Sequence, residues 1–159
     1  MEIRKAIEKA KKNKKIRNIL NNDGFFCSGF VTIEKGEKIN KWNLNFYNPS
    51  DKKITSIVVG EKVELGTTDK PLHENVTMPD EKKIKIKGEE ALEKAKKEFK
   101  KMGKPLAKIL ISFQKKDEEV WSISFITKVG SIVNMRLSPE NGKIIETEEV
   151  NLFEKYKAK

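Results

Sequence analysis

The chain has 159 residues and a formal net charge of +10 at pH 7, and hydrophobic and charged residues each make up 36% of it. This length fits one medium domain or two small ones, with enough apolar material for a core beneath a strongly charged surface. The sequence has no apolar run near the roughly 18 residues of a membrane-spanning helix and no apolar signal stretch in residues 1–12. We therefore expect no membrane span and a cytoplasmic protein, or an extracellular one if an export signal originally preceded residue 1.

Cysteine and histidine each occur once, as Cys27 and His73. A lone cysteine excludes an internal disulfide, and the two residues together are too few for an ordinary structural zinc site. His73 lies in a polar stretch with no nucleophile motif, and Cys27 alternates with the residues of a predicted strand, as a small buried hydrophobic residue would. We therefore predict a protein that is not an enzyme, with no catalytic residues, no cofactor and no metal.

Acidic residues form two clusters, at residues 117–119 and at Glu146, Glu148 and Glu149. Carboxylate clusters can bind a cation, but a solvated turn and a charged strand edge explain these two more simply.

The first half of the chain has the pattern of a helix followed by four strands. Ile3, Ala6, Ile7 and Ala10 share one helical stripe, which ends or bends near Asn13 before a further apolar turn at residues 16–20. Strands are predicted at residues 25–33, 42–46, 54–59 and 63–65, and a hairpin turn at residues 35–36 joins the first two.

The second half repeats this order after a polar connector. A short strand is expected at Ile84 and Ile86, and an amphipathic helix at residues 91–102 ends before Gly103. Strands follow at residues 109–113, 121–125, 133–137 and 143–150, with a charged turn at residues 115–119 and a hairpin turn at residues 139–142 that contains Asn-Gly.

The two halves also resemble each other in sequence. Residues 6–12 match residues 91–97, and the only two tryptophans open the patterns Trp-Asn-Leu-Asn-Phe at residues 42–46 and Trp-Ser-Ile-Ser-Phe at residues 121–125. The predicted fold is therefore α+β, with two tandem helix-plus-antiparallel-sheet units of order α-β-β-β-β packed together. Unit 1 covers residues 1–66, a connector covers 67–82, unit 2 covers 83–152, and a charged tail covers 153–159. The markers of the predicted core are Trp42, Phe46, Trp121 and Phe125.

Residues 84–150 resemble the PepSY and PepSY-like families. The resemblance depends on the helix with Ala91 and Ala95, the strand that opens with Trp121, and the stretch 133–145, which has the family's apolar strand, turn glycine and apolar strand. The first half lacks a turn glycine at residues 51–53 and is linked to the family through the internal match. The resemblance implies a helix packed across an antiparallel sheet, and a non-catalytic module associated with regulating or inhibiting peptidases.

A basic surface is predicted on the first helix, where Glu8 is the one acidic residue among the cations Arg4, Lys5, Lys9, Lys11, Lys12 and Lys15. Such a surface is either a solvated helix face or a site for an anion or an acidic partner. We expect a protein or peptide partner first, because edge strands can accept an extended segment. Binding of an anion or nucleic acid by the basic helix is the alternative, although no aromatic residue interleaves with the lysines to stack on bases. The oligomeric state is left open.

Overall fold

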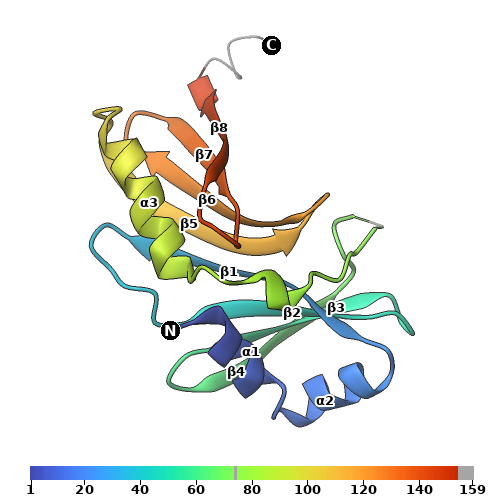
Figure 1. The fold of residues 1–159 in the computed structure, drawn as a ribbon. Helices are drawn as coiled ribbons and strands as arrows, with labels where there is room; N and C mark the ends of the chain where they lie inside the picture. The colour runs from blue at the N-terminus through green and yellow to red at the C-terminus, as the bar shows by residue number, and fades with distance from the viewer. Residues whose placement is uncertain (74, 154–159) are drawn as a thin grey trace.

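The computed structural model describes residues 1–73 and 75–153. It has an α+β fold with one eight-stranded antiparallel sheet and three short helices, so the predicted α+β class with antiparallel strands is confirmed. Figure 1 shows how these elements are arranged. The elements in chain order are α1 (Ile3–Ala10), α2 (Lys14–Asn21), β1 (Phe25–Glu34), β2 (Trp42–Asn48), β3 (Lys53–Val59), β4 (Val63–Asp69), the 3-10 turn η1 (Glu81–Lys83), α3 (Gly88–Lys100), β5 (Leu106–Lys115), β6 (Glu119–Thr127), β7 (Ser131–Leu137) and β8 (Ile144–Asn151).

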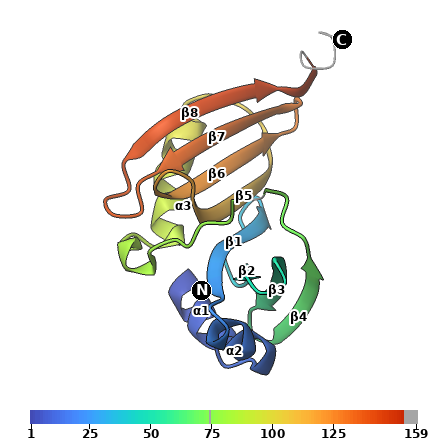
Figure 2. The same cartoon turned by 90° about the vertical axis from the view of Figure 1, so that its right-hand side faces the viewer.

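The strands form one continuous sheet in the order β4-β3-β2-β1-β5-β6-β7-β8. The first strand of each half, β1 and β5, pair antiparallel in the middle, from Ser28 opposite Gln114 to Glu34 opposite Lys108. The sheet is strongly twisted, so that β5–β8 lie at a wide angle to β2–β4 (Figure 2). No break in the sheet marks the predicted boundary between two units. Strand β4 reaches Asp69, three residues into the predicted connector, and residues 154–159 of the predicted tail lie outside the described residues.

All three helices cover the same face of the sheet. α1 contacts β2 and β3, α2 contacts β2, and α3 contacts β6 and β7. The alternating strand residues that face the helices are buried, which is the pattern expected for a sheet with one covered face. All four core markers, Trp42, Phe46, Trp121 and Phe125, are fully buried.

The two tryptophans meet in the middle of the molecule, with ring centroids 5.8 Å apart. Each indole N–H donates to a backbone carbonyl just before a helix, Trp42 to Met1 and Trp121 to Ile86, both at 3.0 Å. Gly88, the first residue of α3, lies against both rings. The covered face therefore holds one shared core.

Three local predictions need correction. The turn expected at residues 16–20 is a full helix, α2, because the Asn13 side chain caps its first turn. The strand expected at Ile84 and Ile86 is absent: this segment is irregular, and the N–H groups of Lys85 and Ile86 both donate to the Pro139 carbonyl. The turn expected at residues 35–36 forms, with the Glu37 N–H donating to the Glu34 carbonyl at 3.1 Å, but it does not lead directly into the next strand, since the connection continues to residue 41 and buries Ile39.

The fourth correction concerns Glu119, which the sequence places in a solvated charged turn. The structure makes it the first residue of β6 and leaves only 2% of its side chain exposed. Its Oε1 accepts a hydrogen bond from the Asp80 N–H at 3.0 Å, and Lys83 Nζ lies 3.2 Å from Oε2. A charge can be buried here because a backbone donor and a cation accompany it. Glu119 thereby attaches the connector to the sheet.

Candidate functional site

The helical layer does not cover the edge strand β4. Every residue of β4 is exposed. Leu65 and Val63 are 46% and 40% exposed, although they pair with the fully buried Ile57 and Val59 of β3. These two β4 side chains therefore point toward the helical layer without being covered by it. An uncovered edge strand offers both unpaired backbone groups and apolar side chains to a partner.

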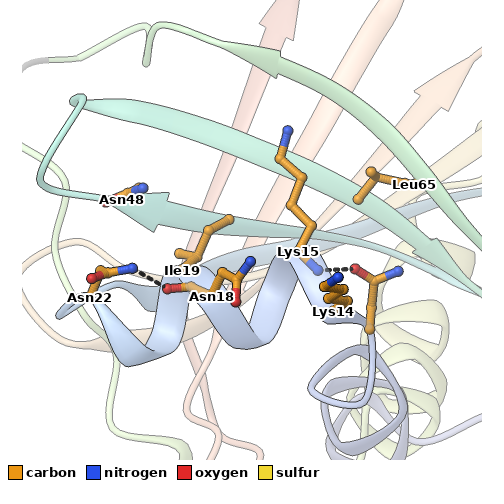
Figure 3. A pocket seen from close by; sticks show the side chains of 8 residues that line it. Lys14, Lys15, Asn18, Ile19, Asn22, Asn48 and Leu65 are labelled. Carbon is orange, nitrogen blue, oxygen red and sulfur yellow. Dashed lines mark hydrogen bonds between the residues drawn. The ribbon is translucent and has the colours of Figure 1, made fainter.

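A groove of about 550 Å³ lies between α2 and β4. We call it the α2–β4 groove; Figure 3 shows its lining residues, which are Asn13, Lys14, Lys15, Asn18, Ile19, Asn22, Asn48 and Leu65. Ile19 and Leu65 supply the apolar part, and the asparagines supply donors and acceptors. A groove that combines apolar surface with polar groups has the components of a binding site.

Lys15 crosses the groove from the helix to the strand (Figure 3), and its Nζ lies 3.3 Å from Thr68 Oγ1. The start of α2 fixes this direction, because Asn13 Oδ1 accepts hydrogen bonds from the N–H groups of Lys15 and Ile16 at 2.9 and 3.3 Å. The Lys15–Thr68 contact is exposed, so an incoming segment can displace it at small cost.

The opposite edge strand, β8, has a different character. It carries Glu146, Glu148 and Glu149, and two of these carboxylates are paired, Glu146 with Arg136 and Glu149 with Lys104. Charged residues on an edge strand discourage pairing with another chain. In β4 the central residues 65–68 are Leu-Gly-Thr-Thr, which carry no charge. Of the two edge strands, β4 is therefore better suited to pair with a strand of another chain.

The cations of the predicted basic surface point in different directions. Arg4 and Lys11 face the connector, where Arg4 Nη2 donates to the Glu81 carbonyl at 2.6 Å and Lys11 Nζ lies 3.9 Å from the Glu81 carboxylate. Lys9 Nζ donates at 2.9 Å to the Gly60 carbonyl at the β3–β4 turn, and Lys15 reaches β4. Lys5 and Lys12 are exposed on the outer side of α1. The six cations therefore do not form one site.

Cys27 and His73 both line a second cavity, of about 640 Å³, beside the connector. Cys27 Sγ donates to the Asn45 carbonyl at 3.3 Å, and burial raises the pKa of its thiol to about 11. A thiol with this pKa is protonated at neutral pH and is a poor nucleophile.

Of the residues of the α2–β4 groove, Lys15 alone was among the sequence candidates, as part of the predicted basic surface. The one available signal was the uncharged run Leu-Gly-Thr-Thr at residues 65–68, directly after the last predicted strand of the first half. Asn18, Asn22 and Asn48 gave no signal, because asparagine is also the ordinary residue of turns and helix ends. Their convergence depends on how α2 lies over the sheet.

Within residues 1–73 and 75–153, no helix is long and apolar enough to cross a membrane. Over the same residues, no group of three or more histidine, cysteine or acidic side chains is placed to hold a metal ion.

Comparison with known proteins gives a fold relationship. No family model matches the chain, and no curated protein matches it. The chain is similar in structure to a putative lipoprotein from Clostridium difficile 630, with a TM-score of 0.60 and 16% sequence identity. The match covers 94% of this chain and 93% of the other, so the fold is shared along nearly the whole length.

Proposed function

We propose that this protein is a non-catalytic binding module that accepts an extended protein or peptide segment along the edge strand β4. The observation that carries the proposal is the exposure of Leu65 and Val63 on the side of β4 that faces the helices. An extended segment beside β4 would form backbone hydrogen bonds with its free edge, as in other complexes formed by strand addition. Alternate side chains of that segment would cover Leu65 and fill the α2–β4 groove.

The chemistry of the groove suits a peptide. Ile19 and Leu65 would hold an apolar side chain, while Asn18, Asn22 and Lys15 offer polar groups close to it. Peptide binding by strand addition derives affinity from the main chain and specificity from pockets for alternate side chains. The groove is one such pocket.

The test is selection of binders from a phage library of random 12-residue peptides, followed by NMR mapping of the selected peptides on the full chain. We expect amide signals of residues 63–69 and α2 to shift, and we expect Leu65→Arg to abolish binding. Ile145→Arg is the matched control, because Ile145 is 61% exposed on the opposite edge strand. Selected peptides that shift β8 instead, or that bind Leu65→Arg normally, would refute the proposal.

We further propose that the two halves are PepSY-like repeats joined through β1 and β5. The proposal is supported by the four consecutive strands that follow the helices of each half, two helices in the first and one in the second, and by the equivalent hydrogen bonds of Trp42 and Trp121. The PepSY resemblance implies modulation of a peptidase as the purpose of binding. A panel of purified peptidases assayed with and without the protein tests this role, and a change in kcat/KM that Leu65→Arg removes is the expected result.

The alternative function is binding of an anion or nucleic acid by the outer faces of α1 and α2. It is favoured by four exposed cations, Lys5, Lys12, Lys14 and Arg17, for which the described part of the chain provides no ion pair. Affinity for a short single-stranded nucleic acid should then fall steeply with salt and collapse when Lys5, Lys12 and Arg17, none of which lines the α2–β4 groove, are changed to glutamate. Reversal of Lys97, Lys100 and Lys101, which are exposed at the end of α3, is the control for the same change in net charge.

A further inference from the structure

The α2–β4 groove carries positive charge. Lys14 and Lys15 are two of its eight lining residues, and none of the eight is acidic. All eight belong to the described part of the chain. Within residues 1–73 and 75–153, neither lysine has a carboxylate partner. Two unpaired cations in a groove whose lining contains no acidic residue favour a negatively charged ligand.

The ammonium group of Lys15 lies beside the edge strand. Its Nζ is 3.3 Å from Thr68 Oγ1, and Figure 3 shows the side chain extending from α2 across the groove. Thr68 Oγ1 also lies 2.9 Å from Thr55 Oγ1 of the neighbouring strand. Both hydroxyl groups are neutral, so this contact fixes the position of the lysine and leaves its charge uncompensated.

Leu65 and Thr68 both face the helical layer, because they pair with Ile57 and Thr55 of β3, which are buried. Ile57 and Thr55 are two positions apart, so a regular strand places two side chains at this spacing beside Leu65 and Thr68. An extended segment on the free side of β4 would do the same. Its residue beside Leu65 would lie over the apolar part of the groove, and its residue beside Thr68 would lie next to Lys15.

The acidic residues of β4 itself do not compete for Lys15. Glu64 pairs with Val58 and Asp69 pairs with Ile54, and these two β3 residues alternate with the buried ones. Glu64 and Asp69 therefore point to the other face of the sheet. On the helix-facing side, Lys15 is left for a carboxylate that a partner supplies.

We propose that the extended segment bound along β4 carries an acidic residue two positions from an apolar residue. The apolar side chain covers Leu65, and the carboxylate replaces the Thr68 hydroxyl as the partner of Lys15. Lys14, which lines the same groove, adds to the attraction. A charge-assisted hydrogen bond is stronger than the one to a neutral hydroxyl that it replaces. This inference rests on the proposed strand addition and names the peptide chemistry that β4 selects.

The test compares synthetic ten-residue peptides, blocked at both ends, that contain one leucine among threonines and serines. Glutamate, glutamine or lysine stands two positions before or after the leucine, so that both strand directions are covered. NMR titration of the full chain at physiological ionic strength gives the Kd, and the amide shifts of residues 63–69 locate the site. We expect the better glutamate peptide to bind about tenfold more tightly than its lysine counterpart, with glutamine between them.

Reversal of the groove charge should reverse this order. In Lys14→Glu/Lys15→Glu we expect the lysine peptide to bind most tightly. Lys12→Glu/Arg17→Glu is the matched control, since both residues are exposed close to the groove in sequence but do not line it, and the change in net charge is the same. The control should keep its preference for glutamate, because salt screens charges outside the groove.

Equal affinity of the glutamate, glutamine and lysine peptides, with shifts at residues 63–69, would overturn the acidic preference and leave strand addition intact. A control that loses the preference would also overturn it, because the peptides would then respond only to net charge. So would a protein in which none of the peptides shifts residues 63–69, including one that forms a dimer through β4. The peptides selected from the random library then decide separately whether strand addition occurs.

Discussion

Glu119 is the one acidic side chain among the described residues that is almost fully buried, and its environment fixes its charge state. Burial by itself raises the pKa of the carboxyl. Hydrogen bonds from the Asp80 and Glu119 N–H groups and the Lys83 ammonium outweigh it, so that the pKa lies below the ordinary value. The folded state therefore favours the carboxylate more than the unfolded state does. Its stabilising contribution is present above the ordinary pKa of 4.5 and is lost as the pH falls through the lowered pKa of the folded state.

We predict that Glu119→Gln lowers the free energy of unfolding at pH 7 by about 1–3 kcal/mol, the usual loss for a buried hydrogen bond to a charged group. The difference from the unchanged protein should narrow in acid, where both side chains are neutral. Urea unfolding at pH 7 and at several values below pH 4.5 measures both effects.

Glu118→Gln serves as the control, because Glu118 is exposed in the preceding turn. It should unfold at the same urea concentration as the unchanged protein. Equal stability of Glu119→Gln and the unchanged protein at pH 7 would show that the carboxylate does not hold the connector.

At the scale of elements, the close packing of α3 against the core depends on Gly88, which has no side chain. A Cβ atom on Gly88 would lie 3.2 Å from Trp121 Cη2 and 3.2 Å from Trp42 Cζ2. Both indoles are fully buried, and each is held by a hydrogen bond to a backbone carbonyl. Neither ring can therefore move aside easily.

We predict that Gly88→Ala destabilises the protein by about 1–3 kcal/mol, the usual cost of overpacking. This loss should exceed the gain of up to about 1 kcal/mol that alanine brings to a helix over glycine. Chemical denaturation gives the free energy, and a shift in tryptophan emission reports the displaced rings. Glu93→Ala, at an exposed position of the same helix, should leave both nearly unchanged; a stabilised Gly88→Ala would mean that α3 can shift freely.

Elements that are determined by residues close together in the sequence were predicted correctly. The stripe Ile3, Ala6, Ile7 and Ala10 gave α1, and Asn141-Gly142 gave the turn before β8, where Gly142 has a φ of 75°. Features that depend on contacts between distant parts of the chain were missed. Ile84 and Ile86 alternate as strand residues do. In the structure, however, this segment meets no partner strand, and the N–H groups of Lys85 and Ile86 share one acceptor, the Pro139 carbonyl. The burial of Glu119 depends on Asp80, 39 residues away, and no local pattern predicts it.

At the scale of the whole molecule, the two halves share one sheet and one core. The contact between Trp42 and Trp121 joins helix-covered strands from both halves, and β1 pairs with β5 over seven residues of each strand. Because core residues of the two halves pack against each other, neither half has a complete core of its own.

We predict that the protein unfolds in a single cooperative transition. Two single-tryptophan variants, Trp42→Phe and Trp121→Phe, each report one half by fluorescence. In each variant the fluorescence midpoint in urea should coincide with the midpoint from far-UV circular dichroism. Separate midpoints for the two signals would show that the halves unfold independently.

The candidate site also depends on how elements from different parts of the chain pack together. Leu65 was recognised as a strand residue, but its exposure depends on where α2 ends over the sheet, which the sequence of β4 does not encode. The basic helix was recognised as well. Its cations separate because the connector and the β3–β4 turn approach it from different sides.

The pairing of β1 with β5 also has a consequence for biosynthesis. The paired residues are between 74 (Glu34 with Lys108) and 86 (Ser28 with Gln114) positions apart in the chain. While the ribosome is still translating the second half, β5 is incomplete, and the side of β1 that pairs with it has no partner. A nascent chain in this state exposes the unpaired backbone N–H and C=O groups of a strand. Stalled or truncated products should therefore aggregate unless a chaperone binds them.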